Sequence, residues 1–169
     1  MTNNWRGILK IETIQHIRNG KVIWEDSNIH NTLHQLGEAF LLTACFANDG
    51  SIVPNNYYFG LDSRTTISIS DTISSLTDEP VSGGYVRIPI SSSSGFTITS
   101  IGGIYRAVTP TLVYTGAGAG FGPVKNLFMV TTADNTGTLV SSAPLSSPIT
   151  LASGDSVNLK MSLQLHDCP

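Results

Sequence analysis

The stretch 155-DSVNLKMSLQL-165 decides the fold, because apolar and polar residues alternate along it one for one. The apolar positions are Val157, Leu159, Met161, Leu163 and Leu165. A strand with this period buries one face and leaves the other in water, as in antiparallel sheets. Ser153-Gly154-Asp155 supplies a turn into it. The stretch therefore predicts a half-buried antiparallel strand near the end of the chain.

The sequence before this strand contains more segments of the same kind. Each is short, rich in β-branched residues and bounded by Gly, Pro, Asn or Ser: residues 96–101, 104–108, 111–115, 127–132 and 139–143. Short strands at intervals of about ten residues indicate a sandwich or jelly roll. We therefore predict a mainly β protein, an antiparallel β-sandwich or jelly roll, with residues 1–169 forming a single β-rich domain.

The first third of the chain predicts a hairpin and one helix. Asn19-Gly20 separates two β-prone runs, and this pair is the strongest short signal for a two-residue hairpin turn. Thr32 and Gln35 have the spacing of a capping box. An amphipathic helix over about residues 32–47 follows from an apolar stripe at spacings of three and four: Leu33, Leu36, Phe40, Leu41 and Ala44.

The middle of the chain, 57-YYFGLDSRTTISISDTISSLTDEPVSGGYVRIP-89, connects the two halves. It begins as a strand in which Gly60 permits close approach of a neighbour, and we expect the strand to resume at Tyr85. Between them, the polar alternation of residues 65–70 suits an exposed edge or an extended arm. Asp71 is expected to cap a short helix that runs through Leu76. We therefore predict residues 64–82 to be an extended excursion from the sheet.

Composition limits the classes of partner. The chain has 169 residues, a formal net charge of −3 and a pI near 5.7. Without a basic cluster, nucleic-acid binding is not expected. The longest apolar run, residues 39–47, is far shorter than the roughly 20 residues of a membrane span, so no membrane partner is expected. No signal peptide is recognisable, which indicates synthesis and retention in the cytoplasm unless a larger assembly carries the chain out.

Only 12% of the residues are charged, against about 25% in ordinary globular proteins. Ser, Thr, Asn and Gly make up much of the remaining surface. Such a surface favours broad subunit contacts, in which few charges have to be desolvated. A monomeric β domain with a polar surface is the alternative.

No catalytic constellation emerges from the residues. The glycine-rich residues 116–122 lack the Lys-Ser/Thr of a phosphate loop, and we interpret them as a hairpin tip or a close subunit contact. His30 and His34 lack a third metal ligand and are interpreted as residues of the cap region and surface. The two cysteines, Cys45 and Cys168, form no disulfide framework.

The acidic residues of the connection are interpreted as carboxylates of turns and caps: Asp62, Asp71, Asp78 and Glu79. No serine stands in a nucleophile elbow. We therefore expect no catalytic residue, no cofactor and no metal, and a protein that is not an enzyme.

Four segments together resemble the small structural proteins of tailed-bacteriophage virions. They are NTLHQLGEAFLL (31–42), YYFGLDSR (57–64), DTISSLTDEPVSGGYVR (71–87) and LASGDSVNLKMSLQL (151–165). Members of that family decorate or cement capsids, or belong to necks and tails. The resemblance implies a β-sandwich without catalytic residues, made in the host cytoplasm and located in the virion. It favours a capsid decoration (cement) protein that bridges neighbouring capsid subunits.

The expected partner is the major capsid protein or another virion protein. A homo-oligomer is also expected, with a trimer favoured because cement proteins occupy symmetric junctions. The predicted contact residues lie in the excursion and in an N-terminal arm of residues 1–7: Arg64, Thr65, Ile67, Ile69, Trp5 and Arg6.

Two other functions remain open. One is a neck or tail accessory protein. The other is a carbohydrate-binding β-sandwich, for which the candidate aromatic residues are Tyr57, Tyr58, Tyr105 and Tyr114.

Overall fold

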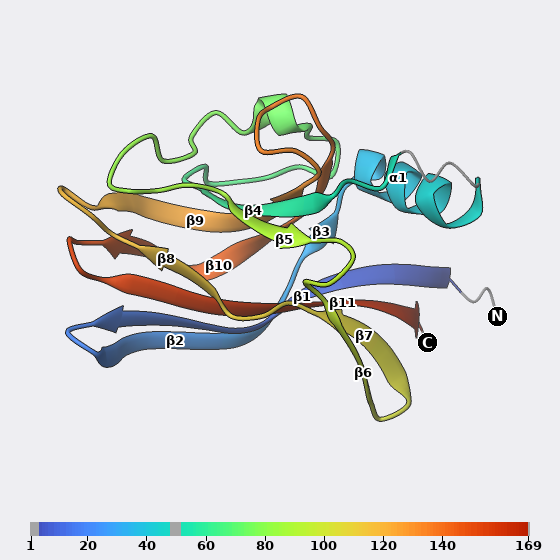
Figure 1. The fold of residues 1–169 in the computed structure, drawn as a ribbon, viewed down its shortest axis with the longest axis horizontal. Coiled ribbons are helices and arrows are strands. Elements are labelled where there is room, and N and C mark those ends of the chain that lie inside the picture. The colour runs from blue at the N-terminus through green and yellow to red at the C-terminus, as the bar shows by residue number, and fades with distance from the viewer. Residues whose placement is uncertain (1–3, 48–51, 169) are drawn as a thin grey trace.

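A computed structural model describes residues 4–47 and 52–168, with the side chains of residues 4–9 and 165–168 outside the description. Two antiparallel sheets pack face to face, as Figure 1 shows. The first sheet has the strand order β2-β1-β11-β7-β6, and β8 also pairs with β11. The second has the order β3-β10-β9-β4-β5. This architecture confirms the prediction of a mainly β, antiparallel sandwich with an N-terminal hairpin and one helix.

The strands of the first sheet are β1 (Asn4–Arg18), β2 (Lys21–His30), β6 (Thr97–Ile101), β7 (Ile104–Val108), β8 (Leu112–Thr115) and β11 (Ser156–Cys168). Those of the second are β3 (Thr32–Leu33), β4 (Asn56–Asp62), β5 (Ile88–Ser91), β9 (Phe121–Val130) and β10 (Leu139–Leu151). The helices are α1 (Gln35–Phe46) and a 3₁₀ turn, η2 (Ile73–Ser75).

The predicted hairpin is confirmed at β1 and β2. Arg18 pairs with Lys21, and the two residues between them have positive φ, 51° at Asn19 and 72° at Gly20. These are the values that a type I′ turn requires, and its twist matches that of the strands it joins.

Strand β11 lies at the centre of the first sheet. It pairs with β1 along one edge and with β7 and β8 along the other. Thr109 lies between β7 and β8, and its backbone N–H donates to the carbonyl of Met161 at 2.9 Å. The predicted inward residues Val157 and Leu159 are buried, as is Met161, so the alternation is confirmed in this part of the strand. It is wrong beyond Met161, where Ser162 and Gln164 are buried and Leu163 is half-buried.

The main core lies between the two sheets. Tyr114, from the first sheet, donates a hydrogen bond of 2.7 Å from its hydroxyl to the carbonyl of Phe59 in the second. The fully buried members of this core include Ile11, Ile14, Leu61, Val124, Leu127, Val140, Leu159 and Met161. The sandwich is therefore joined by apolar packing and by at least one hydrogen bond between the sheets.

A second core covers the outer face of the second sheet. Phe128, Val130 and Leu139 point away from the main core and pack against Ile73 and Leu76 of the connection between β4 and β5. Strand β9 is consequently buried on both faces, because Leu127 and Met129 alternate with Phe128 and Val130.

The helix is shorter than the predicted 32–47, and the predicted capping box at Thr32 is wrong. Thr32 belongs to β3, where it pairs with Ser142, and the helical N-cap is His34, whose side chain makes no capping hydrogen bond. Leu36 is exposed, whereas Gly37 and Phe40 are buried. At Gly37 the helix lies directly against the backbone of Val140. A Cβ at this position would overlap the Val140 carbonyl, so the close packing requires a glycine.

Strand bounds also differ from the predictions. The chain rejoins the sheet at Ile88 rather than Tyr85. Strand β9 begins at Phe121, and β10 continues to Leu151. Residues 65–70 form no strand.

The glycine-rich residues 116–122 are not a hairpin tip, because the chain crosses there from β8 in the first sheet to β9 in the second. Gly116 and Gly120 fit this crossing because backbone carbonyls of Ala152 and Leu151 occupy the space of a Cβ.

Candidate partner-contact site

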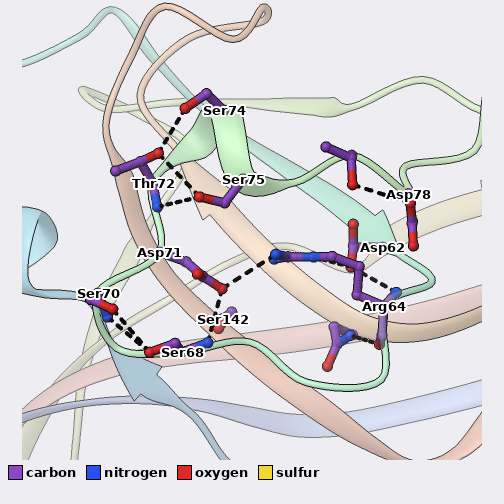
Figure 2. A network of polar contacts seen from close by, with 12 residues as sticks. Asp62, Arg64, Ser68, Ser70, Asp71, Thr72, Ser74, Ser75, Asp78 and Ser142 are labelled. Carbon is purple, nitrogen blue, oxygen red and sulfur yellow. Dashed lines mark hydrogen bonds and ion pairs between the residues drawn. The ribbon is translucent and has the colours of Figure 1, made fainter.

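The excursion of residues 64–82 lies over the outer face of the second sheet and is held there at both ends. Figure 2 shows its polar contacts as far as Asp78, with Asp62 and Asp71 beside Arg64 and the hydroxyls of Thr72, Ser74 and Ser75 in a separate group. The excursion was predicted to be extended, but it is folded onto the sheet.

Arg64 forms the first anchor. Its Nε lies 3.2 Å from Oδ1 of Asp62, and its Nη1 lies 3.3 Å from Oδ2 of Asp71. The backbone N–H of Arg64 also donates to Asp62 Oδ1, at 2.9 Å. The carbonyl of Arg64 accepts a hydrogen bond from the Asn126 side chain on β9. The guanidinium is therefore held within the molecule between two carboxylates.

Asp71 does not cap the short helix, so that prediction is wrong. Its Oδ2 accepts a hydrogen bond from the backbone N–H of Ser68 at 2.9 Å, which closes a turn. The N-cap of η2 is Thr72, whose backbone N–H donates to Oγ of Ser75 at 3.2 Å (Figure 2). The carboxylate of Asp71 therefore takes no part in capping η2, and the same Oδ2 pairs with Arg64.

The second anchor is the ion pair of Glu79 with Arg87, at 2.7 Å. The Tyr85 hydroxyl donates to Oε1 of Glu79 at 2.5 Å. Burial raises the pKa of Tyr85 far above its ordinary value, so the hydroxyl remains a donor at neutral pH. Arg87 also donates to the carbonyl of Asp134 at 2.6 Å and to Oδ1 of Asn135 at 2.6 Å. One arginine thus links the excursion to the loop between β9 and β10.

Each predicted contact residue of the excursion can now be placed. Arg64 is committed to its two carboxylates, and Ile67 packs partly against the second core. Thr65 is exposed, with its Oγ1 3.2 Å from Nζ of Lys125. Ile69 is 50% exposed, although its backbone carbonyl accepts a hydrogen bond from Gln35 at the start of α1. Thr65 and Ile69 are the two of these four that are available to a partner.

The predicted N-terminal arm is partly described. Residues 1–3 lie outside the described residues. Trp5 and Arg6 belong to β1, where they pair with Asp167 and His166 at the end of β11. The backbone of this part of the arm is therefore a strand of the first sheet.

Two exposed valines lie near the second anchor. Val81 and Val86 are both exposed and lie on either side of the turn at Gly83-Gly84. Asp62, Asp71 and Glu79, in contrast, are paired with arginines. The interpretation of these three carboxylates as structural groups agrees with their contacts. We use the name contact surface for the four exposed residues Thr65, Ile69, Val81 and Val86, of which the first two lie in the first half of the excursion and the last two beside the second anchor.

His34 lies in the cap region, as interpreted from the sequence, because it is the N-cap residue of α1, but it is buried and not on the surface. Its Nε2 lies 2.9 Å from Oγ of Ser142, and its Nδ1 lies 3.3 Å from the carbonyl of Ile69. Burial lowers the pKa of the imidazole. His30 is exposed on β2, so the two histidines do not form a metal pair. Within residues 4–47 and 52–168, no group of three or more His, Cys, Asp or Glu side chains could hold a metal ion.

Three of the four aromatic candidates for glycan binding are buried or half-buried and pack within the protein. Tyr114 is buried, and Tyr57 and Tyr58 are half-buried against the two cores. Tyr105 is the exposed one of the four.

A groove of about 600 Å³ on the outer face of the first sheet was not predicted from the sequence. Glu12 and Arg106 form an ion pair of 2.9 Å beside it, and Ser162 donates a hydrogen bond of 2.6 Å to the same carboxylate oxygen. The bond from Ser162 and the pairing with Arg106 lower the pKa of Glu12 despite its burial. This carboxylate is therefore a charged structural group. Glu12 and Arg106 are 94 residues apart, and no local signal joins them.

No protein-family model matches the chain, and no curated protein matches it as a relative. Of the helices in the described residues, none has the length and apolar character needed to cross a membrane.

Proposed function

We propose that the protein is a non-enzymatic structural protein of a tailed-bacteriophage virion, a capsid decoration (cement) protein that binds the major capsid protein. The observation that carries this proposal is the exposure of the four contact residues, which are three apolar side chains and a threonine within residues 65–86. Three carboxylates of the same part of the chain, Asp62, Asp71 and Glu79, are paired with arginines. A partner can cover such a surface with little cost of desolvating charge. The resemblance of four segments to virion proteins supports the same proposal.

The action of such a protein is stoichiometric binding. Each copy bridges neighbouring shell subunits, so rupture of the head has to break the added contacts together with those of the shell itself. Binding to the assembled shell alone stabilises that state by mass action. This function requires a rigid surface, which the two anchors of the excursion supply.

A binding assay with heads that lack the protein tests the proposal. The triple variant Ile69→Asp, Val81→Asp and Val86→Asp places three carboxylates on the contact surface. We expect wild-type protein to sediment with the heads and the triple variant to remain in the supernatant. Val22→Asp, which changes an exposed valine on β2 in the other sheet, is the matched control and should bind normally.

Equal binding of the triple variant and the wild type would contradict this assignment of the surface. Imaging of intact virions tests the location. Density for this chain on the neck or tail would replace decoration by an accessory role there, and its absence from virions would overturn the proposal.

A further inference from the structure

The edges of the two sheets differ in how they are protected. Exposed edge strands pair with other chains unless charge, proline, shortness or a covering segment prevents it. Strand β2 carries Lys21 and Glu25, β5 contains Pro89, and β3 has two residues. Strand β8 has four residues, and the turn at Gly84 lies against its last residue, Thr115.

Strand β6 has no such protection. Its sequence, TITSI, contains neither charge nor proline, and among residues 4–47 and 52–168 it pairs with β7 alone. Ile98 is 67% exposed on one face and Ile101 57% exposed on the other. In Figure 1 the β6–β7 hairpin projects from the end of the first sheet, away from the second sheet. The open edge is therefore accessible to another strand.

The hairpin turn determines which backbone groups are free. Ile101 pairs with Ile104 across the two-residue turn Gly102-Gly103, whose φ values are 60° and 82°. In such a hairpin the residues that flank the turn form a hydrogen-bonded pair, and hydrogen-bonded and non-hydrogen-bonded pairs alternate from there. The N–H and C=O groups of Ile98 and Ser100 therefore point to the open edge.

We propose that a second copy of this chain occupies the edge, with β6 pairing antiparallel to β6 around a two-fold axis at Thr99. This register places Ile98 of each copy opposite Ser100 of the other. The free groups of these two residues then form four main-chain hydrogen bonds. Thr99 faces its own counterpart in a non-hydrogen-bonded pair, where side chains lie closest, and threonine pairs are favourable there.

The side chains support this register. Tyr105, on β7, is 71% exposed and lies opposite the small Ser100 of β6. In the dimer, Ile98 of the second copy lies on the far side of Ser100, so a large side chain flanks the small one on each side. On the other face, Ile101 lies beside Thr97 of the second copy. Small residues thus face large ones on both faces of the joined sheet.

Charge also favours a second copy as the occupant. Each copy carries a formal net charge of −3, so two copies associate best where neither presents charge. Residues 88–105 contain no charged residue, and β6 lies within this range. The contact is isologous and closed, because each copy uses its edge once. It gives a two-fold dimer in place of the trimer expected from the sequence.

Sedimentation of the full chain tests the proposal. We expect a dimer for the wild type and a monomer for Ile98→Lys and for Ser100→Pro. The proline removes an N–H that points to the edge and leaves the pairing with β7 intact. Val22→Lys, at a half-exposed valine on the opposite edge of the same sheet, is the control and should remain dimeric. Circular dichroism of each variant checks that the fold is retained.

Cross-linking tests the register independently. In a chain with Cys45→Ser and Cys168→Ser, the added change Thr99→Cys places two thiols across the axis, with Cα atoms about 4.5 Å apart. That separation permits a disulfide. Thr97→Cys is the control, because its two copies are separated by about 13 Å in the proposed register. We expect an oxidised covalent dimer for Thr99→Cys alone. A monomeric wild type, a dimer that survives both Ile98→Lys and Ser100→Pro, or equal cross-linking at both positions would overturn the proposal.

Discussion

Phe128 packs directly on Gly60, its cross-strand partner, so closely that a Cβ at position 60 would overlap the ring. The guanidinium of Arg87 lies 5.3 Å from the centroid of the same ring. These contacts place the ring of Phe128 at the middle of the second core and connect β4, β9 and the second anchor of the excursion. The stability of the excursion should therefore depend on this aromatic ring.

Gly60→Ala is expected to lower the free energy of unfolding by about 1–3 kcal/mol, because an added methyl group overpacks the site. Denaturant unfolding measures the change. In a double-mutant cycle, Phe128→Leu should reduce the penalty of Gly60→Ala, since the smaller side chain leaves room for the methyl group. Strict additivity of the two changes would show that the ring is not the obstacle.

Ile67→Asp and Ile69→Asp are expected to act differently. Ile67 packs on the second core, so a carboxylate there should lower the free energy of unfolding by about 1–3 kcal/mol. Ile69 is half exposed, and its substitution should change stability by less than about 0.5 kcal/mol while it weakens binding to heads. Thermal melts and the sedimentation assay measure the two effects. Similar destabilisation by both variants would contradict this distinction.

Arg87→Lys should loosen the loop between β9 and β10. A lysine cannot reproduce the forked contacts of Arg87 with Glu79 and with Asp134 and Asn135. We expect faster proteolytic cleavage within residues 131–138, measured by limited proteolysis and mass spectrometry. Unchanged cleavage would mean that the arginine does not hold the loop.

Asp155 is expected to make stability dependent on pH in the acid range. Hydrogen bonds from Arg18, at 2.6 and 3.0 Å, lower the pKa of its carboxyl well below the ordinary value of 3.8. A carboxylate with a lowered pKa in the folded state stabilises above its unfolded pKa, and this contribution is lost as pH falls below about 4. Asp155→Asn should lower the melting temperature at pH 7 and flatten its decline from pH 5 to pH 2. Asp78→Asn, at an exposed carboxylate, is the control and should keep the wild-type decline.

His34 should act in a higher pH range. Because burial lowers its pKa below the ordinary value of 6.5, the folded state binds a proton less readily than the unfolded state. Stability is therefore expected to fall as pH decreases through about 6.5. His34→Gln should remove this part of the slope between pH 7.5 and 5, whereas His30→Gln should retain it. Unfolding free energies measured across that range would contradict the assignment if both variants had the same slope.

The sequence predicted those elements that depend on neighbouring residues. The hairpin followed from Asn19-Gly20, whose positive φ angles are local. The inward face of the first half of β11 followed from the alternation of residues 157–161, and the close approach at Gly60 followed from a glycine within an apolar strand. Each of these features has a recognisable signal within a few residues along the chain.

The remaining features depend on contacts between distant segments. The helix begins at Gln35 rather than Thr32 because β3 pairs with the distant strand β10, in the register Thr32 with Ser142 and Leu33 with Ser141. His34 is buried by the same association, through its contact with Ser142. The excursion folds onto the sheet because Ile73 and Leu76 bury the apolar side chains of Phe128 and Val130. The local sequence of residues 64–82 does not reveal these distant partners.

Because β9 is buried on both faces, we expect its backbone amide protons to be among the slowest of the molecule to exchange with solvent. Amide protons of Leu127, Phe128, Met129 and Val130 are covered by the main core on one side and the second core on the other. They should exchange only when the whole molecule unfolds, so their rates give the global stability directly. In a monomer, amide protons at the outer edge of β6 should exchange rapidly through local opening. In the proposed dimer they are hydrogen-bonded to the second copy, and their exchange rates should fall toward those of β9.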